Sequence, residues 1–197
     1  MRFTFVVAAY LESTPHSSGF ARLASGAFYF AISNLNFCEI IKFDMKIVLG
    51  SDHAGFELKA DLRDYLVEQN IAIFDMGVAE EIPADYPEIA RAVAEKISQK
   101  EFERGILICG SGIGMSIVAN RFPGVRAALC HDLYTARMSR EHNDANLLVL
   151  GGRLIGKGLA REMIKVWLES VFQGGNHQRR LDQIESLDNE MKERREK

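Results

Sequence analysis

The sequence predicts an α/β fold: a doubly wound, Rossmann-like parallel sheet in a single domain that ends in a C-terminal helix. Short apolar segments alternate along the chain with segments of helical period. The apolar segments are continuous, which is typical of parallel strands that are buried on both faces. Polar or glycine-rich turns follow several of them. Because strand–helix–strand connections are right-handed, we expect helices on both faces of the sheet.

The predicted elements begin at Met45. We predict strands at 46–50, 71–74, 105–109, 125–130 and 147–150. We predict helices at 56–68, 89–97, 115–120, 134–140 and 159–171. The helix at 56–68, for example, places Leu58, Leu62 and Leu66 at helical spacing. A last helix at 178–197 carries apolar residues at helical spacing among dense charges, and we expect it to pack on a partner subunit.

Length and composition favour one soluble domain. A chain of 197 residues can bury one core and is too short for two domains of ordinary size. A net charge of −3, with basic residues interspersed among acidic ones, gives no field for holding nucleic acid. The three cysteines, Cys38, Cys109 and Cys130, lack CxxC spacing. Reduced thiols in a cytoplasmic protein fit this pattern best.

Residues 1–44 differ from the rest, because aromatic and small residues follow no sustained period there. We treat 1–44 as an N-terminal extension and 45–197 as the functional domain. The apolar run at 1–10 is weak as a signal peptide. The uncharged stretch between Arg22 and Glu39 includes Ser, Gly and Asn and is short for a span, so we predict no transmembrane helix. Translation from an upstream start, a tag-like leader and a genuine appendage all stay open.

Chemically active side chains follow the predicted strands. Asp52 and His53 follow the first strand, Cys109 ends the third, and His131 and Asp132 follow the fourth. In an open parallel sheet ligands bind beyond the carboxyl ends of the strands. We therefore expect these groups to converge on one edge.

Residues 110–114 (GSGIG) can direct several backbone N–H groups at one anion, because glycine tolerates unusual dihedral angles and a helix follows. A tight packing turn between strand and helix is an equally good interpretation. The segment is neither GxGxxG nor a Walker lysine loop, so it implies no nucleotide.

Three further groups each have two interpretations. Cys109 is either a buried small hydrophobe or a thiol whose thiolate form is stabilised at a helix start. His142 lies in the polar segment 141–146, which is either a solvated turn or a source of proton transfer and oxyanion hydrogen bonds. Arg179 and Arg180 suit phosphate binding or a solvated helix start.

Taken together, five segments closely resemble the type B ribose-5-phosphate isomerases. They are GSDHAGFELK (50–59), DYP (85–87), GILICGSGIGMSIVANRFPGVRAALCHD (105–132), REHNDANLLVLGGR (140–153) and GGNHQRR (174–180). The resemblance covers 45–197. The galactose-6-phosphate and allose-6-phosphate isomerases belong to the same wider family, whereas the type A isomerases have an unrelated fold.

The resemblance implies interconversion of ribose 5-phosphate and ribulose 5-phosphate through a cis-enediolate, in the pentose phosphate pathway, with no metal or cofactor. Cys109 matches the thiolate that removes the proton from C2 and returns it at C1. Ser111 and the N–H groups of Gly110, Gly112 and Gly114 match an anion hole for the enediolate.

The remaining matches concern the sugar ring and the phosphate. His142 matches the acid/base that opens the ring, with Asp52 assisting it and Asn143 donating to the oxyanion. Phosphate-binding positions match His53, Arg153 and Arg180, and a substrate-contacting position matches Tyr86.

One departure from the family pattern concerns Asn176, where many relatives have arginine. One phosphate contact is therefore either missing or supplied by another group such as Arg179. The family pattern also implies active sites that are shared within a homodimer, or within a tetramer built from two dimers.

Three alternatives stay open. An isomerase of a six-carbon phosphosugar would have a roomier pocket near Asn176. A phosphosugar-binding module without turnover would not need Cys109, His142 and Asp52 together, so their presence favours the enzyme. A flavodoxin-like nucleotide binder would carry an aromatic and hydroxyl-rich phosphate loop, which this glycine turn is not.

Overall fold

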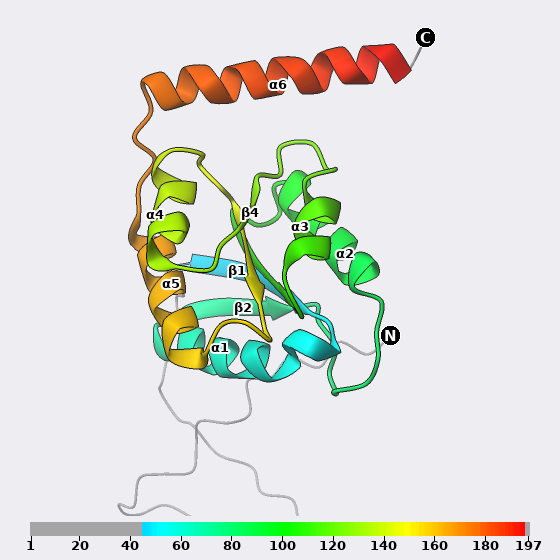
Figure 1. Cartoon of the computed structure of the whole chain (residues 1–197), viewed down its shortest axis with the longest axis vertical. Helices are drawn as coiled ribbons and strands as arrows, with labels where there is room; N and C mark the ends of the chain where they lie inside the picture. The colour runs from blue at the N-terminus through cyan, green and yellow to red at the C-terminus, as the bar shows by residue number, and fades with distance from the viewer. Residues whose placement is uncertain (1–44, 196–197) are drawn as a thin grey trace, which may run out of the picture. The chain divides into compact units, whose positions relative to one another are not determined.

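Five parallel strands form one sheet in the computed structural model, which describes residues 45–195 (Figure 1). The strands are β1 (Met45–Ser51), β2 (Ile71–Asp75), β3 (Arg104–Cys109), β4 (Ala127–Leu129) and β5 (Leu147–Gly151). Their order in the sheet is β2-β1-β3-β5-β4, and all neighbouring pairs are parallel. This arrangement confirms the predicted doubly wound α/β fold.

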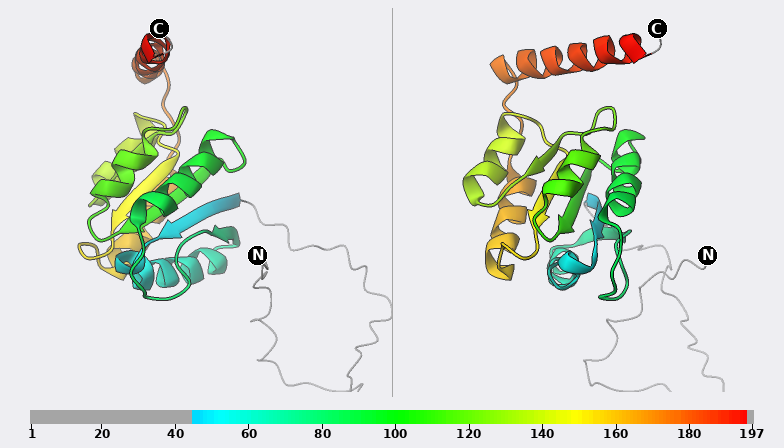
Figure 2. Two further views of the ribbon diagram at one scale, coloured as in Figure 1. Left: turned by 90° about the vertical axis from the view of Figure 1, so that its right-hand side faces the viewer. Right: turned by 45° about the vertical axis from the view of Figure 1, so that its right-hand side comes forward.

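Helices cover both faces of the sheet (Figure 2). One face packs against α1 (Phe56–Glu68), α4 (Leu133–Glu141) and α5 (Lys157–Glu169). The other face packs against α2 (Tyr86–Ser98) and α3 (Ile113–Ala119). A short 3₁₀ helix, η1 (His53–Gly55), leads into α1, and α6 (Asn176–Arg195) ends the described chain.

Alternate residues of each central strand are buried on opposite faces. Ile47 and Leu49 of β1 belong to the core beneath α1 and α5, whereas Val48 between them belongs to the core beneath α2. The helices complete the first core with Trp167, which is fully buried. Because both faces are covered, the strands must be apolar throughout, which explains their continuous apolar sequences.

The strand order changes direction between β1 and β3. The chain passes from β1 to β2 on one side and then crosses to β3 on the other side of β1. The carboxyl ends of β1 and β3 therefore diverge into different loops and leave a crevice, the usual ligand position in such sheets. The two ends stay in contact, since the Asp52 N–H donates to the Ile108 carbonyl oxygen at 3.3 Å.

Several elements end a few residues from their predicted bounds, and two of these differences have a clear local cause. Helix α2 begins at Tyr86 instead of residue 89, because Pro87 is tolerated in a first helical turn, where its missing N–H would have no partner. Strand β4 is shorter than the predicted 125–130. The Arg126 N–H donates to the Asn146 side chain at 2.8 Å, so a side chain replaces the neighbouring strand there.

A buried ion pair ties α1 to the loop after β2, and nothing in the sequence predicted it. Lys59 is 2% exposed, and its Nζ lies 2.9 Å from Asp75 Oδ2. The same Nζ donates to the Val78 carbonyl oxygen at 2.6 Å. This lysine therefore holds the loop that leads from the β2 edge towards α2.

Helix α6 begins at Asn176, two residues before the predicted start, and exposes most of its apolar side chains. Leu181 is 6% exposed, whereas the exposed fractions of Ile184, Leu187 and Met191 are 49%, 58% and 51%. Within the described chain nothing covers these three side chains.

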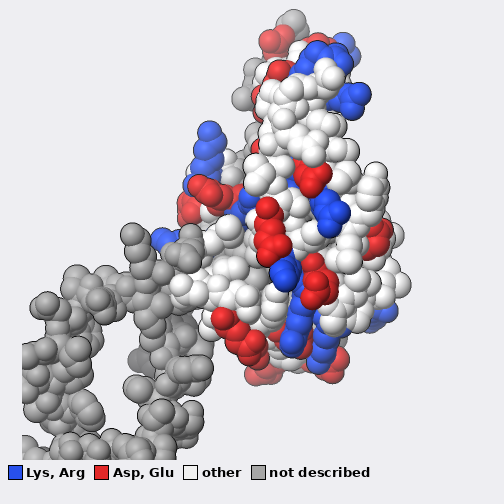
Figure 3. Space-filling view, turned by 90° about the vertical axis from the view of Figure 1, so that its left-hand side faces the viewer, with Lys and Arg blue, Asp and Glu red and all other residues white. Residues whose placement is uncertain are grey.

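Charges of both signs are interspersed on the face that carries α4 and α5, so that face has no extended basic patch (Figure 3). None of the helices within 45–195 is long and apolar enough to cross a membrane. The predicted extension 1–44 lies outside the described residues.

Candidate active site

The end of β3 places a thiol against a backbone donor. Cys109 is the last residue of β3 and is 5% exposed, and its Sγ accepts a hydrogen bond from the Gly112 N–H at 3.2 Å. Gly112 has a φ of 81°, and a Cβ at this position would clash with the Leu129 side chain. Only glycine fits both the dihedral angle and the space, so this glycine fixes the donor over the sulfur.

The rest of the glycine turn lies between two side chains from other segments. The Tyr86 ring lies against Gly114, where a Cβ would come 2.5 Å from a ring carbon. The Arg153 side chain lies beside Gly110, with Cδ 3.7 Å from the corresponding Cβ position. Ser111 Oγ accepts from the Ile113 N–H at 3.4 Å. The turn thus brings Tyr86, Arg153 and Ser111 to the same strand end as Cys109.

The loop after β5 is held to this turn by backbone hydrogen bonds. The Gly152 N–H donates to the Cys109 carbonyl oxygen at 2.8 Å, and the Arg153 N–H donates to the Gly110 carbonyl oxygen at 3.1 Å. The Arg153 guanidinium therefore comes from a backbone that is fixed directly to the thiol-bearing strand.

The end of β1 contributes a carboxylate and an imidazole. Asp52 is 5% exposed and caps η1, since its Oδ1 accepts from the Gly55 N–H at 3.1 Å. His53 Nδ1 accepts from the Ala84 N–H at 3.3 Å. An accepting Nδ1 puts the proton of a neutral ring on Nε2, which then serves as a donor.

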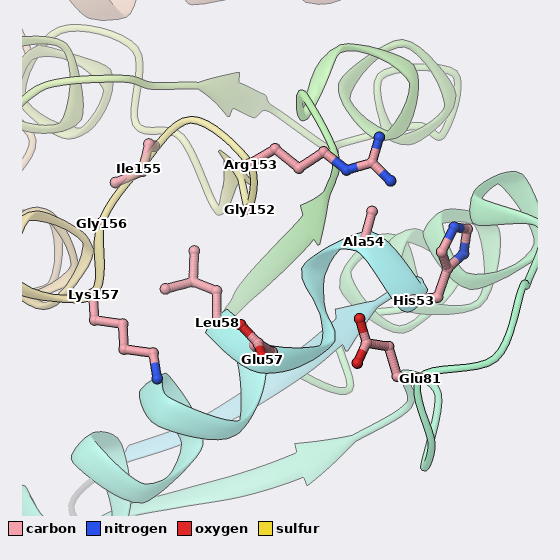
Figure 4. A pocket seen from close by; sticks show the side chains of 10 residues that line it. All are labelled: His53, Ala54, Glu57, Leu58, Glu81, Gly152, Arg153, Ile155, Gly156 and Lys157. Atoms are coloured by element: carbon pink, nitrogen blue, oxygen red, sulfur yellow. The ribbon is translucent and has the colours of Figure 1, made fainter.

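A cleft of about 370 Å³ opens beside these groups (Figure 4). Its lining residues are His53, Ala54, Glu57, Leu58, Glu81, Gly152, Arg153, Ile155, Gly156 and Lys157. The cleft includes two of the predicted phosphate-binding residues, His53 and Arg153, but neither Cys109 nor Ser111. Arg153 and His53 are the cleft residues that suit an anionic group, whereas Glu57 and Glu81 bring negative charge to the same lining.

The structure places His142, Asn143 and Arg180 away from this edge. His142 follows α4 and precedes β5, so it lies at the amino ends of the strands. Cys109 pairs with Gly151 at the carboxyl end of β5, and the strand itself spans roughly 13 Å. Arg180 is on α6, the helix whose His177 stacks on His142. One chain therefore carries the predicted site residues in two groups at opposite edges.

A stacked pair of imidazoles marks the second group. The rings of His142 and His177 lie 4.1 Å apart between centroids and are inclined by 7°. Burial lowers the pKa of His177, and the neighbouring His142 and Arg180 lower it further. His177 lies in the segment GGNHQRR but is not among the predicted site residues. Its position at the start of a helix after two glycines was the available signal.

Across residues 45–195 no three His, Cys, Asp or Glu side chains come together in a way that could hold a metal ion. The groups gathered at the carboxyl edge are a thiol, a turn of backbone donors and a cleft whose lining includes His53, Arg153 and Lys157 as well as Glu57 and Glu81. A thiol beside a turn of backbone donors, at the switch point of a parallel sheet, is an arrangement that can bind a small anionic substrate next to a potential base.

The comparisons with known proteins agree with this kind of site. Ribose-5-phosphate isomerase B of Escherichia coli is 42% identical over 143 residues, which are 73% of this chain and 96% of that protein. D-erythrulose-4-phosphate isomerase of Pectobacterium atrosepticum is 41% identical over 142 residues, 71% of this chain and 93% of that protein. The solved structure of Clostridium thermocellum ribose-5-phosphate isomerase B is 46% identical and superposes with a TM-score of 0.73, covering 75% of this chain and 99% of that one.

The pattern of the Ribose/Galactose Isomerase family matches residues 47–184. The chain belongs to that family, and it is an aldose–ketose isomerase.

Proposed function

We propose that this enzyme interconverts ribose 5-phosphate and ribulose 5-phosphate, with Cys109 as the base. The observation that supports this role is the hydrogen bond from the Gly112 N–H to Cys109 Sγ, at the edge where the cleft lined by His53 and Arg153 opens. A backbone N–H that donates to sulfur stabilises a thiolate, which is the form that removes a proton. The family membership supplies the reaction class.

The reaction moves one proton between two carbons. The Cys109 thiolate takes the proton from C2 of the open-chain aldose, and the C–H electron pair becomes the double bond of a cis-enediolate as negative charge builds on O1. The N–H groups of the turn and the Ser111 hydroxyl are the donors for that charge. The Cys109 thiol then returns the proton to C1, while the hydroxyl proton passes from O2 to O1, which gives the ketose.

The phosphate occupies the basic side of the site in this proposal. His53 and Arg153 line the cleft, and Arg153 lies next to the glycine turn. Arg180 adds a further contact, and Tyr86, packed on Gly114, contacts the sugar. A guanidinium suits a phosphate because it donates in a planar fork. Asn176 supplies no charge, so Arg153 and Arg180 carry more of the phosphate binding than in relatives with arginine there.

The complete site requires two copies of the chain. His142, Asn143 and Arg180 lie at the edge opposite Cys109, so a second subunit must supply them if they act on the same sugar. Helix α6 supports this arrangement, because its exposed Ile184, Leu187 and Met191 form an apolar stripe that a partner subunit would cover. We therefore propose a homodimer with two shared sites, which can pair further into a tetramer. His142 then opens the ring with help from Asp52, and Asn143 donates to the oxyanion.

Kinetic measurements on four sugar phosphates test this proposal. We expect kcat/KM for ribose 5-phosphate to exceed that for allose 6-phosphate, galactose 6-phosphate and D-erythrulose 4-phosphate. Erythrulose 4-phosphate is included because of the relative that bears its name. A higher value for any other sugar would replace the proposed substrate and keep the chemistry. Binding of all four sugars without turnover of any would instead favour the phosphosugar-binding module.

We also propose a cytoplasmic location. Cys109 and Cys130 are both free thiols, and a catalytic thiolate needs a compartment that keeps it reduced.

A further inference from the structure

The corner that follows α4, residues 142–146, carries two of the proposed site residues and is held by an unusual set of contacts. His142 and Asn143 lie at its start, and Asp144 adopts a φ of 45°. A left-handed conformation is uncommon for a residue with a side chain, and it persists where the surroundings enforce it. The contacts of Asp144 identify what enforces it here.

Two arginines pair with the two oxygens of the Asp144 carboxylate. Arg126, just before β4, has its Nη2 2.6 Å from Asp144 Oδ2, and its Nε donates to the Asp144 carbonyl oxygen at 2.9 Å. Arg140, in the last turn of α4, has its Nη1 2.8 Å from Asp144 Oδ1. The same Nη1 donates to the Ala145 carbonyl oxygen at 2.7 Å. The carboxylate thus joins the end of α4 to the start of the edge strand.

The charges around this carboxylate are mostly positive. Arg140 is only 7% exposed, so its charge needs a buried partner. A third arginine, Arg104, has its pKa lowered to about 10, chiefly by burial and then by Arg140, while Asp144 acts in the opposite direction. Asp144 is the acidic group that pairs with both Arg126 and Arg140, and its loss would leave the buried Arg140 guanidinium without this counter-charge.

We propose that Asp144 is a positioning residue for the isomerase reaction: by bridging Arg126 and Arg140 it fixes the corner that presents His142 and Asn143 to the substrate. This inference rests on the proposed function, because His142 and Asn143 have no role without it. Asp144 itself need not touch the sugar. It sets the direction of the two side chains before it, in the way that groups behind a catalytic residue set its orientation.

The test variant is Asp144→Asn, because asparagine tolerates the left-handed conformation and loses only the charge. We expect kcat to fall roughly 10- to 100-fold while KM changes less than about 3-fold. Arg126→Gln, at a partly exposed position, should also lower kcat. This substitution removes the ion pair between Arg126 and Asp144 and leaves the pair between Arg140 and Asp144. This second variant serves if Asp144→Asn folds poorly.

The matched control is Asp61→Asn. Asp61 pairs with Arg161 through two hydrogen bonds of 2.6 and 2.9 Å that join α1 to α5, away from the corner. The Asp61→Asn variant should lose an ion pair comparable to that of Asp144 and keep the wild-type kcat. In a His142→Asn background, Asp144→Asn should slow the enzyme little further, because residues that act through one another are not additive.

The outcomes separate the two proposals. If the wild-type enzyme turns over ribose 5-phosphate, and Asp144→Asn and Arg126→Gln keep full kcat, the positioning role is wrong and the proposed function stands. Equal losses of kcat in Asp144→Asn and Asp61→Asn, in step with the folded fraction measured by circular dichroism, would also overturn it. Absence of turnover in the wild type would instead remove the proposed function.

Discussion

The proposed role of Cys109 as a base depends on its neighbours more than on its own burial. A buried cysteine at a strand end is ordinarily an inert hydrophobe. What distinguishes this one is the Gly112 N–H that donates to its sulfur, from a backbone conformation that a side chain would not allow. The chemistry that we propose for this edge therefore depends on Gly112 as much as on the Cys109 thiol.

Replacing Cys109 with serine tests the base. We expect kcat to fall by at least about a hundredfold, or about 2.7 kcal/mol of transition-state stabilisation, because a hydroxyl is a poor base near neutral pH. The affinity for ribose 5-phosphate, measured by calorimetry, should stay within about threefold, since serine keeps the shape of the site. A variant that retains more than about a tenth of the wild-type kcat would remove Cys109 from the role of base.

At the residue scale, the sequence predicted which side chains lie at the carboxyl edge of the sheet. It did not predict that the proposed site residues are divided between the carboxyl and the amino edge. Asp52, His53 and Cys109 follow buried parallel strands, so their common edge could be inferred from chain order alone. The same chain order places His142 after the helix 134–140 and before the strand 147–150, at the amino edge, so its separation from Cys109 was implied by the predicted elements but was not inferred from them. The partner of Lys59 could not be found either, because Asp75 lies 16 residues away across a turn of the fold.

At the scale of elements, the ion pair between Lys59 and Asp75 joins α1 to the end of β2. The lysine side chain is 3% exposed and the aspartate side chain 26%. A buried charge that loses its partner costs far more than an exposed one, because water cannot replace the partner.

Asp75→Asn should therefore lower the free energy of unfolding by about 2 kcal/mol, since the Lys59 ammonium keeps only the Val78 carbonyl as a strong acceptor. Urea denaturation measures the change. The control is Asp64→Asn, which breaks the exposed pair with Arg63 and should cost less than about 0.5 kcal/mol. Equal losses of the free energy of unfolding in the two variants would show that burial does not make the Lys59–Asp75 pair more stabilising than the exposed Arg63–Asp64 pair.

Element type was predictable throughout the described domain, and element ends were less so. Each predicted strand and helix is present because a parallel sheet with two covered faces imposes distinct patterns on strands and helices. The start of α2 at Tyr86 and the short β4 depend on individual contacts, the placement of Pro87 and the Arg126–Asn146 hydrogen bond. Such contacts leave no periodic trace in a sequence.

At the scale of the whole molecule, every proposed site residue lies after Met45. We predict that a chain beginning at Met45 keeps the wild-type kcat/KM and sedimentation coefficient. A domain of about 150 residues already buries roughly 70% of its unfolded surface and needs no further layer for stability. Kinetics and sedimentation velocity check this prediction. An inactive or dissociated protein would show that residues 1–44 are a structural part of the enzyme.

The proposed site residues are divided between two opposite edges of the sheet, with Cys109 at the carboxyl edge and His142 at the amino edge. If two subunits complete each other, Cys109 from one chain acts with His142 from another. If each chain worked alone, these groups would be separated by the length of a strand, roughly 13 Å, which no side chain spans. The two arrangements predict different behaviour for mixtures of inactive variants.

The most direct measurement is complementation between Cys109→Ser and His142→Asn. Each variant alone should be nearly inactive. After joint unfolding and refolding of equal amounts, half of the dimers should contain one chain of each kind and one intact site, which gives roughly a quarter of the wild-type activity. Recovery of that activity is the result that we predict. A mixture as inactive as the separate variants, with mixed dimers demonstrated by native mass spectrometry, would contradict the shared site.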